Sequence, residues 1–409
     1  MKNRNTKLEK VLKYASENVP FYQGKDYKNI DDFPIIRKEI IKENYADFIS
    51  DLLDNKNEIV HILEDDFVID KYVIEEKIGT DIFVEWTTGT SGVPFKCFKT
   101  KQERKNISLC MWKKRMMIDK SITPLSFLPI IHTGTEPFPF DIRDYSYENL
   151  INIYKYIEDK NINCIHISPT LLKRHLAQEH FKYISIPKCL KYIESTGRFL
   201  DQETKETVER VFDVKIFDMY GTIETWGIAE TCKYDHMHVN TDNIYLELID
   251  EHGKPITDYN KIGIVVITAL NQYMMPFIRY QTNDYAMLID EKCECGQPIT
   301  LKLCKWRESH YLNIDNEKIV GEDFVRKILR KVEYERVFQN LSFIMVRALS
   351  DCDFEIYINK FTDSKSFENL FIKYMTEEIK KSVRISFNYI TEKEHSEINP
   401  KGYIFVRKY

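Results

Sequence analysis

Two stretches of the chain change from a helical pattern into a short apolar run, and this change constrains the fold more than any other feature. Residues 150–167 and 201–217 each begin with polar-faced helical spacing and end in an apolar run, at 164–167 and 214–217. A helix that leads into a short buried strand is what a sheet covered by helices produces. The sequence therefore predicts an α/β fold.

Other segments predict how the chain is divided. Leu8, Val11, Leu12, Ala15 and Val19 follow i, i+3, i+4 spacing, which predicts an opening helix that ends before a proline. Aliphatic runs at 243–250 and 262–270 flank a polar turn and predict two strands. After about residue 307, helical patterns at 322–332 and 365–380 accompany strand patterns at 341–349, 354–359 and 383–390. We expect a large N-terminal domain, 1–307, with mixed sheets and helices, and a small α+β C-terminal domain, 308–409.

Charge and hydropathy exclude several classes of protein. The 409 residues carry 59 Lys+Arg and 64 Asp+Glu, so there is no basic surplus for a nucleic-acid backbone. The longest aliphatic stretch, 262–270, is about half the roughly 20 residues that a membrane span needs. The charged N-terminus leads into no apolar signal core. We expect a cytoplasmic monomer or homodimer that binds neither nucleic acid nor membrane.

The strongest local motif is a loop rich in hydroxyls and glycines. It consists of Thr87, Thr88, Gly89, Thr90, Ser91 and Gly92, and Lys96 follows four residues later. Glycines let backbone N–H groups approach an anion, while hydroxyls and a lysine add donors and charge. Neither a Walker loop nor a G-x-G-x-x-G motif is present. The motif favours phosphate binding; the alternative is an ordinary polar loop between two elements.

Two further motifs gain meaning from their positions. Tyr220, Gly221, Thr222 and Glu224 follow the strand predicted at 214–217, and α/β folds place ligands just past the carboxyl ends of strands. There a tyrosine can stack on a base, a threonine can bind a phosphate oxygen and a glutamate can hold Mg²⁺. Asp284 ends a polar segment, and a carboxylate can accept both hydroxyls of a ribose. Each motif alone is compatible with a surface loop.

The nine cysteines are an odd number without a secretion signal, which argues against a disulfide framework. Cys293 and Cys295 share one tight turn, and Cys232 lies near His236 and His238. Three of these cysteines with one of the two histidines make a candidate Cys₃His zinc set, and we select Cys232, His238, Cys293 and Cys295. The alternative is a pair of reduced cysteines in an exposed turn.

Together and in this order, the three motifs resemble those of the adenylate-forming acyl and aryl ligases, T-S-G-T-T-G-x-P-K, Y-G-x-T-E and R-T-G-D. The flanks at residues 20–22, 32–38, 190–200 and 293–298 resemble the phenylacetate–CoA ligase-like branch. The resemblance implies an AMP-binding and acyl-binding large domain and a mobile small domain. It implies ATP and Mg²⁺ as cofactors, with Thr87 to Gly92 and Lys96 around the phosphates.

The resemblance also implies individual roles. Tyr220 would stack on adenine, and Gly221 beside it would belong to the nucleotide site. Thr222 would contact the α-phosphate and Glu224 the Mg²⁺, while Asp284 would hold the ribose hydroxyls and Arg307 would be a second contact to ribose or phosphate. An acyl pocket would be lined by His132, Thr196, Gly197 and Met219. The family carries a catalytic lysine near its C-terminus where this chain has Tyr403, so Lys401, two residues before it, becomes the first candidate and Lys408 the second. The alternative is that Lys401 is simply a turn residue.

The implied function is ATP-dependent activation of a carboxylic acid as its acyl-adenylate, followed by transfer to a phosphopantetheine thiol of a carrier protein or CoA. The branch favours small aryl acids such as a hydroxybenzoate, and a role in siderophore or other secondary-metabolite biosynthesis would fit. Two alternatives remain: capture of the adenylate by an amine to form an amide, and a catalytically weakened homologue that binds nucleotide or acid. The displaced lysine motivates the second.

Overall fold

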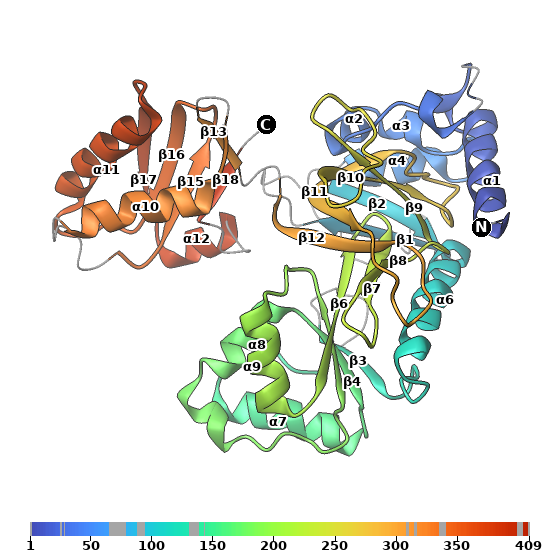
Figure 1. Ribbon diagram of the computed structural model, residues 1–409, viewed down its shortest axis with the longest axis horizontal. Coiled ribbons are helices and arrows are strands. Elements are labelled where there is room, and N and C mark those ends of the chain that lie inside the picture. The colour runs from blue at the N-terminus through green and yellow to red at the C-terminus, as the bar shows by residue number, and fades with distance from the viewer. Residues whose placement is uncertain are drawn as a thin grey trace.

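The computed structural model describes residues 2–24, 27, 29–64, 79–87, 95–130, 139–142, 144–307, 311–314, 317–334, 341–398 and 404–407. Helices and sheets alternate through these residues, and the predicted mixed α/β class is confirmed (Figure 1). The opening helix is α1 (Lys2–Asn18), which ends just before Pro20 as the spacing predicts. It is followed by short helical segments: η1 (Pro20–Tyr22), η2 (Ile30–Asp32), α2 (Lys38–Glu43), α3 (Tyr45–Phe48) and α4 (Lys56–Glu64).

Within the described ranges, ten strands form one long sheet in the order β3-β4-β5-β6-β7-β8-β12-β11-β10-β9. Its first half contains β3 (Phe127–Ile130), β4 (Cys164–Ile167), β5 (Tyr192–Thr196), β6 (Lys215–Thr222), β7 (Trp226–Thr231) and β8 (Met237–Val239). Its second half contains β9 (Ile244–Ile249), β10 (Ile262–Ala269), β11 (Tyr280–Ile289) and β12 (Thr300–Arg307). Strands β3 to β6 are parallel, whereas every pair from β6 onward is antiparallel. The predicted strand pair at 243–250 and 262–270 is therefore β9 and β10.

Helices cover both faces of the parallel half. On one face lie α7 (Tyr147–Asp159), α8 (Pro169–Leu176), η3 (Glu179–Tyr183) and α9 (Gln202–Phe212), which enclose an aliphatic core with Ile165, Ile193 and Ile216. On the other face lies α6 (Lys101–Ile118), whose Ile107 and Met111 pack against Met219. Figure 1 shows α7, α8 and α9 on one side of the strands and α6 on the other. Burial on both faces explains why these strands read as short apolar runs.

A histidine in this aliphatic core gives the fold a pH dependence that can be tested. His175 in α8 is buried, with its Nδ1 atom 3.0 Å from the Tyr154 hydroxyl, and burial lowers its pKa to about 4. An unfolded histidine gains its proton near pH 6.5, so between pH 6.5 and pH 4 the unfolded state binds more protons. We expect the free energy of unfolding to fall by about 3 kcal/mol across this window.

The measurement is urea unfolding of the wild type and a His175→Phe variant at pH 7, 5.5 and 4.5. The variant lacks the titrating ring and should lose much of the decline in stability on acidification. His252→Gln, which changes an exposed turn residue, is the matched control and should keep the wild-type slope. Equal slopes for wild type and His175→Phe would contradict the assignment.

The antiparallel half of the sheet packs against the N-terminal helices. This core is rich in buried aromatic side chains, among them Tyr22, Phe33, Phe48, Phe95, Phe98, Phe277 and Tyr280. A separate antiparallel hairpin, β1 (Ile82–Thr87) with β2 (Phe95–Thr100), contributes Phe95 and Phe98 to it. The hairpin therefore has its inner face fixed in the core, and the hydroxyl-rich motif begins at the end of β1.

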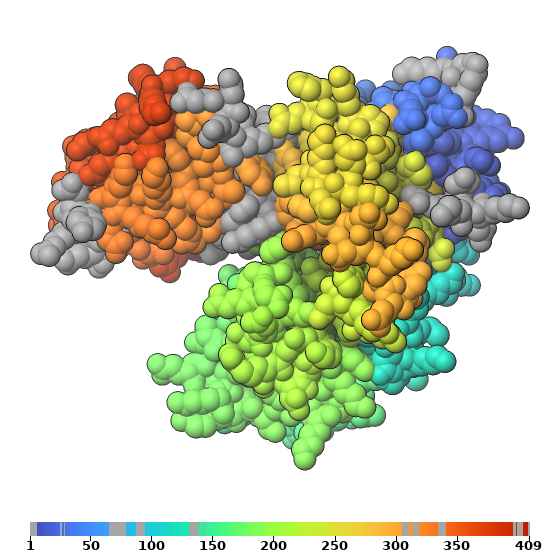
Figure 2. Space-filling model, viewed as in Figure 1, coloured from blue at the N-terminus to red at the C-terminus, as the bar shows by residue number. Residues whose placement is uncertain are grey.

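The residues after β12 form a second sheet with its own core. The hairpin β13 (Tyr311–Ile314) and β14 (Glu317–Val320) leads into α10 (Gly321–Tyr334), and a four-stranded sheet has the order β17-β16-β15-β18. The remaining elements are β15 (Ile344–Ala348), β16 (Asp353–Ile358), α11 (Ser364–Ile379), β17 (Arg384–Tyr389), α12 (Glu392–Ile398) and β18 (Phe405–Arg407). Figure 2 shows these orange-to-red elements as a body of their own beside the ten-stranded sheet. A domain boundary at residue 307 remains a prediction.

None of the helices found among the described residues combines the length and the apolar character that a bilayer span requires.

Candidate functional site

The hydroxyl-rich motif lies mostly outside the described residues. Thr87 ends β1 and Phe95 begins β2, opposite each other in the hairpin, while Thr88, Gly89, Thr90, Ser91 and Gly92 fall in the part that is not described. Lys96 is buried, and its Nζ atom donates to the carbonyl of Ile62 at 3.0 Å. Its ammonium group is thus engaged by the protein interior, and phosphate binding by Lys96 remains a prediction.

The second motif belongs to a strand and a tight turn, which corrects the expectation that it forms a loop after residue 217. Strand β6 continues to Thr222 because β7 pairs with it, and the chain reverses between Thr222 and Trp226. Gly221 is required here: a Cβ atom at this position would lie 2.7 Å from the carbonyl oxygen of Trp226. The Thr222 hydroxyl accepts from the backbone N–H of Thr225 at 3.3 Å and closes the turn.

Tyr220 and Asp284 come together although 64 residues separate them. The Tyr220 hydroxyl donates to Asp284 Oδ2 at 2.9 Å, and both side chains are buried. Asp284 lies within β11 rather than in a loop, and its partner in the sheet register is Arg307 at the end of β12. The hydrogen bond and the strand pairing therefore bring together three of the residues predicted to bind the nucleoside, although β7, β8 and β12 separate β6 from β11 in the sheet.

Glu224 lies on the Thr222–Trp226 turn, and its side chain faces β11, the strand that carries Asp284. Its Oε1 atom accepts a hydrogen bond from the Tyr280 hydroxyl at 2.7 Å, and the side chain is buried. Its backbone carbonyl accepts from the Gln272 amide at 2.9 Å. The carboxylate is thus fixed from β11, and a fixed carboxylate is a suitable ligand for Mg²⁺ beside phosphates.

Three of the four residues predicted for the acyl pocket lie in the described part of the chain. Thr196 ends β5 and is the register partner of Met219 in β6, so the two stand side by side. Gly197 follows with a φ angle of +74°, a left-handed conformation that favours glycine. Met219 packs against Ile107 and Met111 of α6. His132 and Lys401 lie outside the described residues.

Next to this group the structure places buried charges that the sequence did not single out. Arg115 of α6 donates two hydrogen bonds, each 2.7 Å, to the two carboxylate oxygens of Glu194 in β5. His166 Nδ1 in β4 lies 2.6 Å from Glu194 Oε1. Burial would raise the pKa of Glu194, but the Arg115 guanidinium outweighs it and holds that pKa well below its usual range. The alternation of β4 and β5 aims His166 and Glu194 at α6, a signal visible only once the strands were placed.

The structure also brings together the predicted metal ligands. The ligand atoms of Cys232, His238, Cys293 and Cys295 all lie within 4.8 Å of one another. The Sγ atoms of Cys232 and Cys293 are 3.6 Å apart, and Cys295 Sγ is 3.2 Å from His238 Nε2. Sulfurs at this distance are not bonded, whereas a tetrahedral zinc with Zn–S of about 2.3 Å needs an Sγ–Sγ distance of about 3.8 Å.

The protonation states of the cluster suit a cation. Burial lowers the pKa of His238, so its ring is neutral, the form that ligates metals. Burial would raise the pKa of Cys295, but hydrogen bonds from the Gln297 backbone N–H and from the neighbouring thiols lower it. His236, the alternative ligand, instead faces Glu291 at 3.3 Å. The donor set therefore fits one zinc ion and selects His238.

Comparisons with known proteins bear on the fold of the chain. No protein-family model matches the chain. It is similar to the phenylacetate-coenzyme A ligase of Thermus thermophilus, with 22% identity over 320 residues. That match covers 71% of this chain and 66% of the relative, slightly less than two thirds of its length.

The fold is similar to that of two solved structures of 2-hydroxyisobutyryl-CoA ligase. One, in the postadenylation state with R3-HIB-AMP, has a TM-score of 0.60 and 14% identity, and the match covers 100% of this chain and 89% of that chain. The other, an open conformation with 2-HIB-AMP and CoA, also has a TM-score of 0.60 and 14% identity, over 96% and 88%. The fold expected from the sequence resemblance is confirmed.

Proposed function

Taking this chain as a relative of the adenylate-forming acyl-CoA ligases, we propose that it activates a carboxylic acid with ATP and passes the acyl group to a thiol. In the first step a carboxylate oxygen of the acid attacks the α-phosphorus of ATP, the bond to the β-phosphate oxygen breaks, and pyrophosphate leaves. In the second step a pantetheine thiol, as its thiolate, attacks the acyl carbon, a thioester forms and AMP leaves.

The observation that carries this proposal is the convergence of Tyr220, Asp284 and Glu224. The Tyr220–Asp284 hydrogen bond of 2.9 Å joins the ring proposed to stack on adenine to the carboxylate proposed to bind ribose, and Arg307 ends the strand that pairs with Asp284. Glu224 lies on the adjoining turn, where it would ligate Mg²⁺. Mg²⁺, when bound, neutralises charge on the departing pyrophosphate, and two anions held in line can then react.

Small aryl acids such as a hydroxybenzoate are the proposed substrates, and CoA or the phosphopantetheine of a carrier protein is the proposed acceptor. Both assignments rest on the resemblance to phenylacetate–CoA ligases, as does a role in siderophore or other secondary-metabolite biosynthesis. Thr196, Gly197, Met219 and His132 are proposed to line the acid site. Lys401 is proposed to bridge the carboxylate and the α-phosphate in place of the family's lysine.

Acid-dependent exchange of pyrophosphate into ATP tests the first step. A panel of phenylacetate, hydroxybenzoates, 2-hydroxyisobutyrate and acetate should contain at least one acid that supports exchange, and mass spectrometry with CoA should then detect its thioester. Failure of every acid, together with a rise in melting temperature on adding ATP·Mg, would favour the nucleotide-binding alternative. Formation of an amide from an added amine, with no thioester formed from CoA, would favour amide formation.

Two variants test whether Lys401 has taken over the role of the family's C-terminal lysine. Lys401→Ala should abolish exchange if this residue has taken over the role, and Tyr403→Lys in that background should restore part of it. Exchange at the wild-type rate in Lys401→Ala would exclude Lys401.

We also propose that Cys232, His238, Cys293 and Cys295 hold a structural zinc ion. The site has four protein ligands and so leaves no open coordination position, which is typical of structural rather than catalytic zinc. The cluster joins the end of β7 and β8 to the turn before β12. There the two halves of the long sheet meet through only two residue pairs, Thr300 with His238 and Leu301 with Met237.

A further inference from the structure

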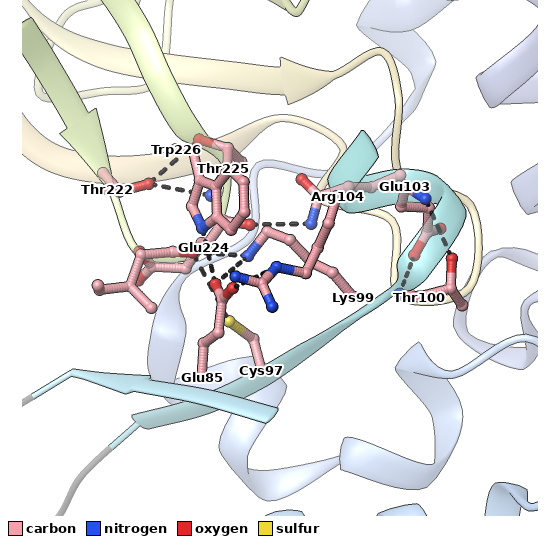
Figure 3. Close-up of polar contacts among 12 residues, drawn as sticks. Glu85, Cys97, Lys99, Thr100, Glu103, Arg104, Thr222, Glu224, Thr225 and Trp226 are labelled. Carbon is pink, nitrogen blue, oxygen red and sulfur yellow. Dashed lines mark hydrogen bonds and ion pairs between the residues drawn. The ribbon is translucent and has the colours of Figure 1, made fainter. Parts of the chain in front are cut away.

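The hairpin β1–β2 carries a buried ion pair that reaches the turn bearing Glu224. Lys99 Nζ lies 2.6 Å from Glu85 Oε2 and donates to the backbone carbonyl of Ile223 at 2.7 Å. The Lys99 side chain is fully buried and that of Glu85 is 12% exposed. Figure 3 shows Lys99 extended from the hairpin toward the turn, with Glu85 beside it. The Lys99 ammonium thus links the Glu85 carboxylate of β1 to the backbone of the turn between β6 and β7.

The same carboxylate also holds the far end of the turn. Trp226 Nε1 donates to Glu85 Oε2 at 2.8 Å, and Lys99 Nζ lies 5.3 Å from the centre of the Trp226 ring. Arg104 Nε lies 3.7 Å from Glu85 Oε1 (Figure 3). Glu85 and Lys99 therefore contact the turn at Ile223 and at Trp226, the residues on either side of Glu224 and Thr225.

The turn needs such support because its backbone is strained. Trp226 has a φ angle of +61°, which is costly for a bulky aromatic residue and persists only where its surroundings hold it. Within the turn the Thr222 hydroxyl bonds to Thr225, and Trp226 pairs with Thr222 where β7 begins. The ion pair adds a side-chain contact to the last residue of the turn, because Glu85 accepts a hydrogen bond from the Trp226 indole.

A buried ion pair is not the most effective way to raise the free energy of unfolding, since an apolar pair of similar volume stabilises the fold as well or better. Burial alone would lower the pKa of Lys99, but the Glu85 carboxylate outweighs it and raises that pKa, so the ammonium stays charged. A charged donor fixes the position of a carbonyl oxygen more strictly than packing does. What is fixed here is the position of the turn that carries Glu224.

We propose that Glu85 and Lys99 are positioning residues that latch the Thr222–Trp226 turn to the β1–β2 hairpin and so hold Glu224 in place for Mg²⁺ bound to ATP. The inference rests on the proposed function. It assigns no contact with substrate to either residue. Loss of the latch should therefore raise the Kd of ATP·Mg and the Mg²⁺ concentration needed for half-maximal exchange, and leave the KM for the acid unchanged.

The test uses the full-length protein with three variants. Lys99→Met removes the ammonium and keeps the length of the side chain. Trp226→Phe keeps a ring and removes the donor to Glu85, and serves if Lys99→Met does not fold. Lys101→Met is the matched control, because Lys101 pairs at 3.3 Å with Asp81 on the exposed surface, only two residues from Lys99.

For Lys99→Met we expect the Mg²⁺ concentration at half-maximal exchange and the calorimetric Kd of ATP·Mg to rise about tenfold, the range that one hydrogen bond from a charged group supplies. The KM for the acid should stay within about twofold, and Trp226→Phe should show a smaller rise in the same direction. Lys101→Met should match the wild type in every measurement. A folded Lys99→Met protein, or failing that Trp226→Phe, with wild-type Mg²⁺ dependence would overturn the latch. So would an equal rise in KM for the acid and for ATP.

The two proposals fail differently. Absence of exchange in the wild type with every acid would reject the proposed function, and the ATP·Mg affinities of wild type and variant would still decide the latch. Equal affinities with intact wild-type exchange would reject the latch and leave the proposed function standing. A wild type that binds no ATP·Mg would reject both.

Discussion

Removing zinc from the cluster of Cys232, His238, Cys293 and Cys295 is expected to lower the melting temperature by at least about 5 °C, because metal binding to a structural site is folding free energy. The cluster lies where β8 and β12 join the two halves of the sheet through two residue pairs. The protein as isolated should contain about one zinc ion per chain. Dipicolinate or a mercurial reagent should release it, and calorimetry before and after release measures the loss of stability.

Hydrogen exchange would locate the effect. Amides of β8 and β12 should exchange faster after the zinc is released, since their short pairing loses its clamp, while amides of β16 in the second sheet should not change. Cys293→Ser should lose the metal and show the same lower melting temperature. Cys304→Ser is the matched control, because Cys304 is a free cysteine of β12 outside the cluster and should keep its zinc. Protein that holds less than about a tenth of an ion per chain, and melts the same with or without chelator, would rule out a structural zinc.

The parts of the fold that depend on local pattern were predictable. The helix α1, the pair β9–β10 and the elements α7, β4, α9 and β6 follow from apolar periodicity and turn residues, which are properties of neighbouring residues. The order of the ten strands could not be predicted, because β8 pairs with β12 across about sixty residues of sequence and only two residue pairs define the contact. No periodicity in the chain encodes such a pairing.

The candidate site divides in the same way. Tyr220, Glu224 and Asp284 could be selected by residue type and order, but their hydrogen-bond partners could not. Tyr280 and Thr225 read as ordinary sheet and turn residues until the sheet is assembled. The two motifs were also expected in loops, although both lie largely in paired strands, because polar residues such as Asp218 and Asn283 are rare in strand interiors.

The threonine of the second motif shows the limit of a sequence match. In the quoted pattern Y-G-x-T-E the threonine is the fourth residue, which is Ile223 here, while Thr222 is the third. In the structure the Thr222 hydroxyl bonds within the turn to Thr225, and Ile223 offers its backbone carbonyl to Lys99. Contact between Thr222 and the α-phosphate remains a prediction, and the buried Lys99 could not be found from the motif because it lies outside it.

Replacing Glu224 by Gln is expected to lower acid-dependent exchange by about 10²–10³-fold, the usual cost of removing one preorganised charge-stabilising group from an active site. Glutamine keeps the volume of the side chain and an oxygen that can accept from the Tyr280 hydroxyl, now 2.7 Å from Glu224 Oε1. It loses the negative charge that would hold Mg²⁺. The measurement is the exchange rate at saturating acid and ATP over a range of Mg²⁺ concentrations, with the melting temperature recorded beside it.

Tyr280→Phe separates the charge of Glu224 from its hydrogen bond. That variant leaves the carboxylate in place and removes only the donor, so its exchange rate should fall by less than about tenfold, the effect of one ordinary hydrogen bond. If the charge acts through Mg²⁺, both variants should need more Mg²⁺ than the wild type for half-maximal exchange, and the increase should be larger for Glu224→Gln than for Tyr280→Phe. A Glu224→Gln protein with exchange within about fivefold of the wild type would show that Glu224 holds the turn but does not bind the metal, and the Mg²⁺ site would then have to be sought among other acidic residues.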